Sequence, residues 1–226
     1  NLSIHKTINP GDFIKTLDNN RLYVMLNNGN SFRLDENSHL KINTSDSFSL
    51  LNGQIYIDSE TKKGNHKLTI NTPIANINHI GTRYSVSYQN ESLNVSVRDG
   101  LVLIDKTNAD KLEIDKGNQY TQSSSGEFKM SEIDTFDDKW HWTQKITQTF
   151  KIQDKSMSEY LEWVSTETGL PIKWESYGIK LKANDVILSG SIDGIMPMDS
   201  IDVIMPTTRF SYEIINNEIY IRYLNG

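Results

Sequence analysis

Residues 92–104 read SLNVSVRDGLVLI, and this stretch decides the structural class of the first half of the chain. Leu93, Val95 and Val97 alternate with polar residues, and side chains two positions apart share one face of a β-strand. The Asp-Gly pair at 99–100 accepts a positive φ at low cost, so it predicts a tight turn. The stretch is therefore interpreted as two short strands joined by a turn.

The same pattern fills the chain from about residue 11 to residue 130. No window there sustains the i, i+3, i+4, i+7 spacing of an amphipathic helix over three turns, so an all-β domain is expected. Asn-Gly pairs at 28–29 and 52–53 predict further turns. A stack of short strands and a meander of hairpins both fit this pattern. The other short apolar runs lie at 22–26, Ser31–Leu34, 55–57, 68–70 and 84–88.

From residue 150 the sequence alternates between strands and helices. Ser156 and Glu159 have the spacing of a capping box, in which each side chain hydrogen-bonds the other residue's backbone N–H. Gly169 and Pro171 predict the end of that helix. Its apolar face is expected to comprise Met157, Tyr160, Leu161, Val164 and Thr168.

The remaining elements complete a small α+β domain. A second helix is expected at 198–205, and a closing hairpin across Asn216-Asn217. The order is β-α-β followed by β-α-β-β, which predicts two helices packed on one small sheet. The expected strands lie at 150–152, 171–175, 186–192, Phe210–Ile215 and Glu218–Tyr223.

A polar loop and a charged, tryptophan-containing segment separate the two patterns. The loop at 121–126 reads TQSSSG, and the segment at 132–145 contains Trp140 and Trp142. A chain of 226 residues is long enough for two domains. We therefore expect a β-rich domain over 1–130, a connector over 131–148, and an α+β domain over 149–226.

Composition excludes several classes of function. The net charge of −6 and the absence of a basic run argue against nucleic-acid binding. The chain has no cysteine, which excludes disulfides, thiolate metal sites and a cysteine nucleophile. No apolar run reaches the roughly 18–20 residues needed to cross a bilayer. The chain begins with Asn1, so any anchor or targeting segment is expected upstream of it.

No catalytic or metal-binding pattern is present. None of the five histidines has the spacing of a helical metal site, and no G-x-S-x-G frames the serines at 123–125. His141 lies between two tryptophans, which leaves a small aromatic site there as a minor alternative. Acidic residues cluster at 134–138 without the glycine turn of a calcium loop. The chain is expected to be non-enzymatic, without cofactor or metal. The histidines are His5, His39, His66, His79 and His141.

Five motifs in the first half occur in the order found in a known family. Residues 70–73 (INTP) followed by 80–86 (IGTRYSV) form the most specific of them. In this order the motifs resemble the FecR family, the periplasmic regulators of the iron-citrate type. The resemblance implies a β-solenoid-like first domain. The other motifs are 26–31 (LNNGNS), 51–57 (LNGQIYI), 97–102 (VRDGLV) and 114–119 (IDKGNQ).

The second half, residues 150–223, resembles the short domain shared by secretins and the N-termini of TonB-dependent receptors, known as the STN domain. The matching residues include 150–153 (FKIQ), 188–190 (LSG) and 210–212 (FSY). FecR-family proteins of Gram-negative bacteria can carry such a domain at the C-terminus.

The two resemblances imply a signalling role. The chain would lie in the periplasm, anchored to the inner membrane upstream, dock an envelope protein such as the signalling domain of a TonB-dependent receptor, and relay to a sigma-factor system. The edge of the closing hairpin would carry the contact by strand addition. The residues expected to face the partner or to lie at the rim of the contact are Tyr212, Glu213, Glu218, Tyr220 and Arg222.

An alternative from another class is a structural or cell-wall-binding envelope protein. In that case the β-rich domain would bind glycan through aromatic side chains on an exposed face. Tyr23, Tyr56 and Tyr84 would be the residues to provide that face.

Overall fold

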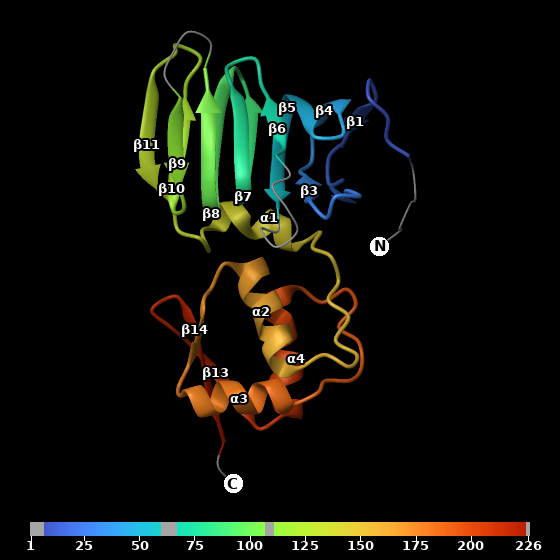
Figure 1. Ribbon diagram of the computed structural model, residues 1–226, viewed down its shortest axis with the longest axis vertical. Coiled ribbons are helices and arrows are strands. Elements are labelled where there is room, and N and C mark those ends of the chain that lie inside the picture. The colour runs from blue at the N-terminus through green and yellow to red at the C-terminus, as the bar shows by residue number, and fades with distance from the viewer. Residues whose placement is uncertain (1–6, 60–66, 107–110, 225–226) are drawn as a thin grey trace. The chain divides into compact units, whose positions relative to one another are not determined.

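The computed structural model describes residues 7–59, 67–106 and 111–224, so His5 and His66 lie outside the described residues. The chain divides into two compact units, Leu2–Thr135 and Phe136–Gly226, each with its own hydrophobic core (Figure 1). The division falls inside the segment interpreted as a connector. Among the described residues, no helix is both long enough and apolar enough to cross a bilayer.

The first unit is built from strands that join into one continuous sheet. Within the described residues this sheet has eleven strands. They are β1 (Phe13–Lys15), β2 (Leu22–Met25), β3 (Ser31–Leu34), β4 (His39–Thr44), β5 (Ser47–Asp58), β6 (Thr69–Asn71), β7 (Asn76–Gln89), β8 (Ser92–Asp105), β9 (Leu112–Asp115), β10 (Asn118–Gln122) and β11 (Phe128–Glu132). The predicted apolar runs all fall on or overlap these strands, and the Asn28-Gly29 turn joins β2 to β3.

Three long strands, β5, β7 and β8, change partners along their length and so join two sections of the sheet. The first part of β5 pairs with β4 and β6, and its second part pairs with β3 and β7. β7 and β8 pair with each other along most of their length, and each changes partner on its other edge: β7 from β6 to β5, and β8 from β10 to β9. Gly53, Gly81 and Gly100 lie at the changes, with φ of 97°, 55° and 86°. Positive φ in these glycines lets each strand bend from one section of the sheet into the other.

Two of these glycines were predicted to be in turns between separate strands, and that prediction is wrong. The pairs 52–53 and 99–100 lie inside β5 and β8. A Cβ at Gly100 would lie 2.8 Å from the carbonyl oxygen of Gly81. Real Cβ atoms essentially never approach so closely, so the bend at position 100 requires glycine for space as well as for φ.

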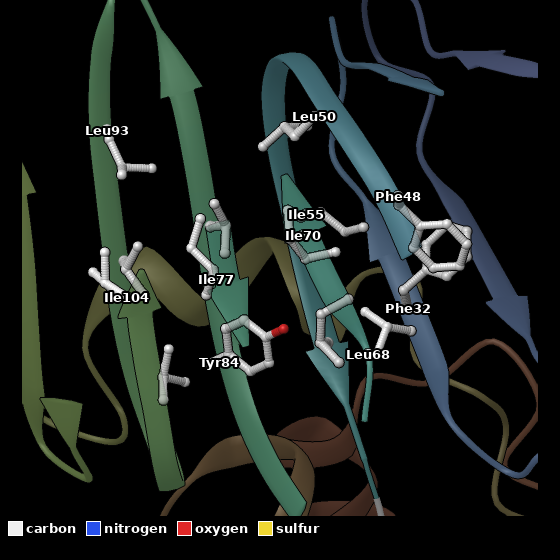
Figure 2. Close-up of a cluster of buried hydrophobic side chains, with 14 of the residues drawn as sticks. Phe32, Phe48, Leu50, Ile55, Leu68, Ile70, Ile77, Tyr84, Leu93 and Ile104 are labelled. Atoms are coloured by element: carbon white, nitrogen blue, oxygen red, sulfur yellow. The ribbon is translucent and has the colours of Figure 1, made fainter. Parts of the chain in front are cut away.

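The inward side chains of both sections of the sheet form a single core. Figure 2 shows Ile55 and Tyr84 from one section among Ile70, Ile77 and Ile104 from the other. All five are 0% exposed. Because both sections bury their side chains in the same cluster, the sheet folds back on itself over a shared core.

The predicted β-solenoid is wrong. A solenoid stacks successive strands in parallel, whereas consecutive strands here pair antiparallel in the β2–β3, β4–β5, β7–β8 and β10–β11 hairpins. Within the described part of this unit, the β5–β6 pair alone is parallel. Antiparallel hairpins are present, but the strand order is not that of a simple meander, because β1 pairs with β4, β5 with β7 and β8 with β10. The mainly-β character is confirmed.

The second unit contains a three-stranded sheet, in the order β12-β14-β13, and helices (Figure 1). β12 is parallel to β14, and β13 is antiparallel to it. The elements are η2 (Asp138–Trp140), α1 (His141–Gln144), α2 (Met157–Thr168), β12 (Ile172–Trp174), α3 (Tyr177–Asp185), α4 (Pro197–Ile204), η3 (Met205–Thr207), β13 (Phe210–Ile215) and β14 (Glu218–Tyr223).

Helix α2 confirms the sequence prediction in detail. The Ser156 hydroxyl accepts a hydrogen bond from the Glu159 N–H at 3.1 Å, and the Glu159 carboxylate accepts from the Ser156 N–H at 2.9 Å. Gly169 ends the helix in the left-handed region, with φ of 79°. The predicted apolar face is buried throughout. This helix therefore packs its core face as its sequence spacing requires.

Three predictions for this unit are wrong. Residues 150–152 form no strand, and 186–192 contribute one isolated bridge between Ser156 and Ile187. Helix α3 was not predicted; the Ser176 hydroxyl caps it by accepting from the Ile179 N–H. The unit therefore packs three helices of eight or more residues with a three-stranded sheet, within the described residues, instead of two helices with a larger one.

Candidate docking edge of the C-terminal hairpin

The β13–β14 hairpin has the bounds that the sequence predicted. Asn216 and Asn217 form its two-residue loop with φ of 51° and 61°. Two consecutive positive φ values match the twist of the flanking strands, and asparagine tolerates them. The loop fixes the register, in which Ile215 faces Glu218 and Glu213 faces Tyr220.

The register separates the five candidate residues onto two faces of the sheet. Paired residues share a face, so Glu213 with Tyr220 lies on the same face as Glu218 and Arg222. Tyr212 pairs with the fully buried Ile221 and therefore lies on the opposite face, toward the core. The structure thus brings four of the five candidates together and excludes Tyr212 from the group.

Tyr212 connects the sheet to helix α4. Its hydroxyl donates a hydrogen bond of 2.7 Å to the Asp202 carboxylate. Burial, together with that hydrogen bond and the negative charge of Asp202, raises the pKa of Tyr212 to about 12. This hydrogen bond links the hairpin to α4.

Arg222 organises the outer face. Its guanidinium lies 3.0 Å from the Glu213 carboxylate, 3.9 Å from that of Glu175, and 5.1 Å from the centre of the Tyr220 ring. These side chains are half-exposed, and exposed ion pairs contribute only about 0–1 kcal/mol to stability. Together the four side chains form a charged and aromatic surface.

The backbone of β13 has hydrogen-bonding groups along its outer edge that find no partner among the described residues. Hydrogen-bonded pairs alternate in an antiparallel ladder, and the pair that flanks a two-residue loop is one of them. Leu224 donates to the Arg209 carbonyl at 2.8 Å, which places 209, 211, 213 and 215 toward β14. Tyr212 and Ile214 therefore direct their N–H and C=O away from it.

At one end of this edge the outward N–H is already hydrogen-bonded, and at the other end the exposed side chains are apolar. The Phe210 N–H donates a hydrogen bond of 3.1 Å to the Thr208 hydroxyl, so it is not available to pair with a further strand. Ile214 is 52% exposed and Ile215 is 38% exposed, at the loop end. Neither isoleucine was predicted as a site residue, although the period-2 pattern of FSYEII places one on each face. The free part of the edge is the segment around Tyr212 and Ile214.

The described histidines provide no catalytic or metal site. His39 packs on the Phe13 ring at 5.4 Å, and His79 is buried in the first core. His141 is exposed while Trp140 and Trp142 are buried, so the three do not share a face. Across the described ranges, no three His, Asp or Glu side chains are placed to share a metal ion.

Two other features of the first unit bear on ligand binding. A cavity of about 150 Å³ has no charged residue in its lining. Tyr56 and Tyr84 are 1% and 0% exposed, so the aromatic face expected for glycan binding does not form. The cavity is lined by Ile8, Pro10, Leu26, Phe32, Ile42, Thr44, Ser45 and Phe48.

The chain resembles known proteins in sequence over part of the first unit and in fold over both units. Residues 12–103 match the family model of FecR protein. Two crystal structures of a candidate anti-sigma factor from Parabacteroides distasonis ATCC 8503 resemble the chain at 16% identity each, with TM-scores of 0.52 and 0.51. The match covers 95% of this chain and 99–100% of those chains, so the fold likeness extends over both units. No curated protein matches.

Proposed function

We propose that the chain is a non-enzymatic regulatory protein of the Gram-negative envelope, acting in the periplasm and anchored to the inner membrane by another part of the full-length protein. It docks an envelope partner, such as the signalling domain of a TonB-dependent receptor, and relays that contact to a sigma-factor system. The observation that carries the proposal is the FecR match over residues 12–103, joined to a separate unit with an open edge strand.

The second unit is proposed to act as an STN-type docking module. Strand addition needs an edge with unpaired backbone groups and side chains that discriminate between partners. The N–H and C=O groups of Tyr212 and Ile214 meet the first requirement. Arg222 and Glu213 meet the second, because they place an ion pair beside the edge, and the Tyr220 ring lies against the Arg222 guanidinium.

A pair of substitutions at one position tests the docking edge. Ile214→Pro removes an N–H that points away from β14, so it removes a donor from the free edge and none from the ladder. Ile214→Thr keeps that donor and is the matched control. In the bacterium of origin, we expect Ile214→Pro to abolish sigma-dependent transcription in response to the inducer, and Ile214→Thr to retain it.

Photo-crosslinking from position 214 identifies the partner directly. Leu181 on α3 is 46% exposed and provides a control position of similar exposure. We expect a specific envelope-protein adduct from 214 and none from 181. Unchanged transcription in Ile214→Pro, with the same adducts from both positions, would rule out this edge as the docking surface.

A further inference from the structure

Strand β11 is the outer edge of the large sheet. In the described part of the chain it pairs with β10 alone, and the sheet ends there. Figure 1 shows it outermost beside β10. Natural proteins usually shield such an edge, because its unpaired backbone groups can pair with another strand. β11 is five residues long and exposed along most of its length.

The backbone direction of β11 follows from its hydrogen bonds. Ser123 donates to the Glu127 carbonyl at 2.9 Å, and Ile133 donates to the Gly117 carbonyl at 2.9 Å. Residues 127 and 133 therefore face β10, and by alternation so do 129 and 131. Three residues direct their N–H and C=O outward. They are Phe128, Met130 and Glu132.

The side chains beside this edge are apolar and cationic. Phe128 is 60% exposed and Met130 is 40% exposed, on the same face of the strand. The Phe128 ring stacks on Tyr120, with centroids 5.8 Å apart. The Lys106 ammonium lies 4.4 Å from the centre of the Phe128 ring and 4.8 Å from that of Tyr120. A positive charge is thus held beside the end of the strand that carries Phe128.

We propose that β11 pairs antiparallel with β11 of a second copy of this chain, with Met130 opposite the partner's Met130. In this register Phe128 faces the partner's Glu132, and Lys129 faces the partner's Ser131. All three outward-facing residues of each strand are then hydrogen-bonded. Two-fold symmetry makes the contact self-complementary and closed.

Charge complementarity selects this register and this partner. It brings the partner's Glu132 beside Phe128, and therefore beside Lys106, twice by symmetry. Moving the register to centre on Lys129 would place Lys129 against the partner's Lys129, and like charges directly opposite are destabilising. Centring on Ser131 would leave the outward groups of Phe128 unpaired. The register centred on Met130 avoids both costs.

The hairpin edge in the other unit lacks this self-complementarity. Pairing two copies through Tyr212 and Ile214 would place Glu213 opposite the partner's Glu213, because these are the central residues of that register. The two edges therefore differ in the partners they fit. β11 fits a second copy, and β13 fits a different protein.

Charge reversal in the full chain tests the proposal by sedimentation equilibrium. We expect the wild type to shift reversibly with concentration from 25.9 kDa toward twice that mass. Glu132→Lys is expected to raise the dimer Kd about tenfold, since it turns two attractive pairs into repulsive ones. Lys106→Glu combined with Glu132→Lys should restore the wild-type Kd. Glu127→Lys makes the same charge change in the β10–β11 loop and should leave the Kd unchanged.

A backbone variant separates the edge contact from the charges. Met130→Pro removes an N–H that makes no hydrogen bond to any described residue, and it is expected to abolish dimerisation while the circular dichroism spectrum stays native. A wild type that remains monomeric at millimolar concentration would overturn the proposal. So would a dimer that is unaffected by Met130→Pro, or one that the charge swap fails to restore.

Discussion

His79 makes the stability of the first unit depend on pH. Its side chain is 1% exposed, and neither ring nitrogen has a hydrogen-bond partner among the described residues. The ring lies against Tyr84, with centroids 5.2 Å apart. Burial lowers the pKa of His79 from 6.5 to about 4, because the imidazolium would lose its hydration in this core.

The size and sign of the effect follow from proton linkage. In the unfolded chain the histidine takes up a proton near its ordinary pKa of 6.5, whereas in the folded chain it does so only near 4. Between these values the unfolded state binds more protons, so stability falls as the pH falls. At about 1.4 kcal/mol per pKa unit, the full loss is about 3 kcal/mol, complete below pH 4 and absent above about pH 7.

Comparison with a variant that cannot titrate isolates this contribution. His79→Phe keeps an aromatic ring of similar size and removes the proton site, so other acid-sensitive groups affect both proteins equally. All four tryptophans lie in the second unit, so their fluorescence does not report on this core. Hydrogen exchange of β7 and β8 amides, measured between pH 7.5 and 4, gives the free energy of opening there.

The expected result is a free-energy difference between His79→Phe and wild type that grows by about 3 kcal/mol in favour of the variant on acidification. A difference that stays constant with pH would show that the two states bind this proton equally. The histidine would then be solvated or partnered in the folded protein, contrary to the reasoning above.

Three substitutions probe other parts of the packing. Leu161→Ala is expected to cost about 2–5 kcal/mol through the cavity it leaves; a loss under about 1 kcal/mol in urea unfolding followed by tryptophan fluorescence would show a face that is not buried. Gly100→Ala should destabilise the first unit by at least about 1 kcal/mol, because its Cβ would meet the Gly81 carbonyl; thermal unfolding unchanged from wild type would contradict this. Ser156→Ala should cost about 1 kcal/mol by removing the cap on the Glu159 N–H, whereas an unchanged urea midpoint would mean the cap is dispensable.

The sequence predicts local features of the first unit better than its topology. The alternation at 93–97 identifies the inward face of β8 correctly, since burial and period 2 are linked within one strand. Gly100 also has the positive φ that the Asp-Gly pair predicts. Whether such a bend reverses the chain or redirects a continuing strand depends on the pairing of β8 with β7, β9 and β10, which lies outside any local window.

In the second unit, the elements predicted correctly are those with the strongest local sequence pattern. Helix α2 has two caps and a five-residue apolar face, and it was predicted correctly. Helix α3 buries only Ile179 and Ala183 and contains Gly178, so its periodicity is weak. The region 186–192 is apolar enough for a strand, but β12 and β13 already occupy both sides of β14. Tertiary competition of this kind leaves no trace in the segment itself.

The hairpin that carries the candidate site was predicted more accurately than the faces on which its residues lie. The hairpin bounds follow from the Asn-Asn loop, and the loop fixes the register. Tyr212 was assigned to the partner-facing group although its pairing with Ile221 places it toward the core. The exposed edge at Ile214 was missed, because exposure of an apolar residue depends on which strand is outermost. That order is a property of the whole sheet.

The most direct test of the docking account is amide hydrogen exchange at β13 in the isolated protein and in its complex with the crosslinked partner. The account predicts fast exchange of the Tyr212 and Ile214 amides in the free protein, because both point away from β14, and strong protection in the complex. The Glu213 amide, already bonded within the hairpin, should change little. Protection confined to other surfaces, with Tyr212 and Ile214 still exchanging fast in the complex, would contradict docking by strand addition at this edge.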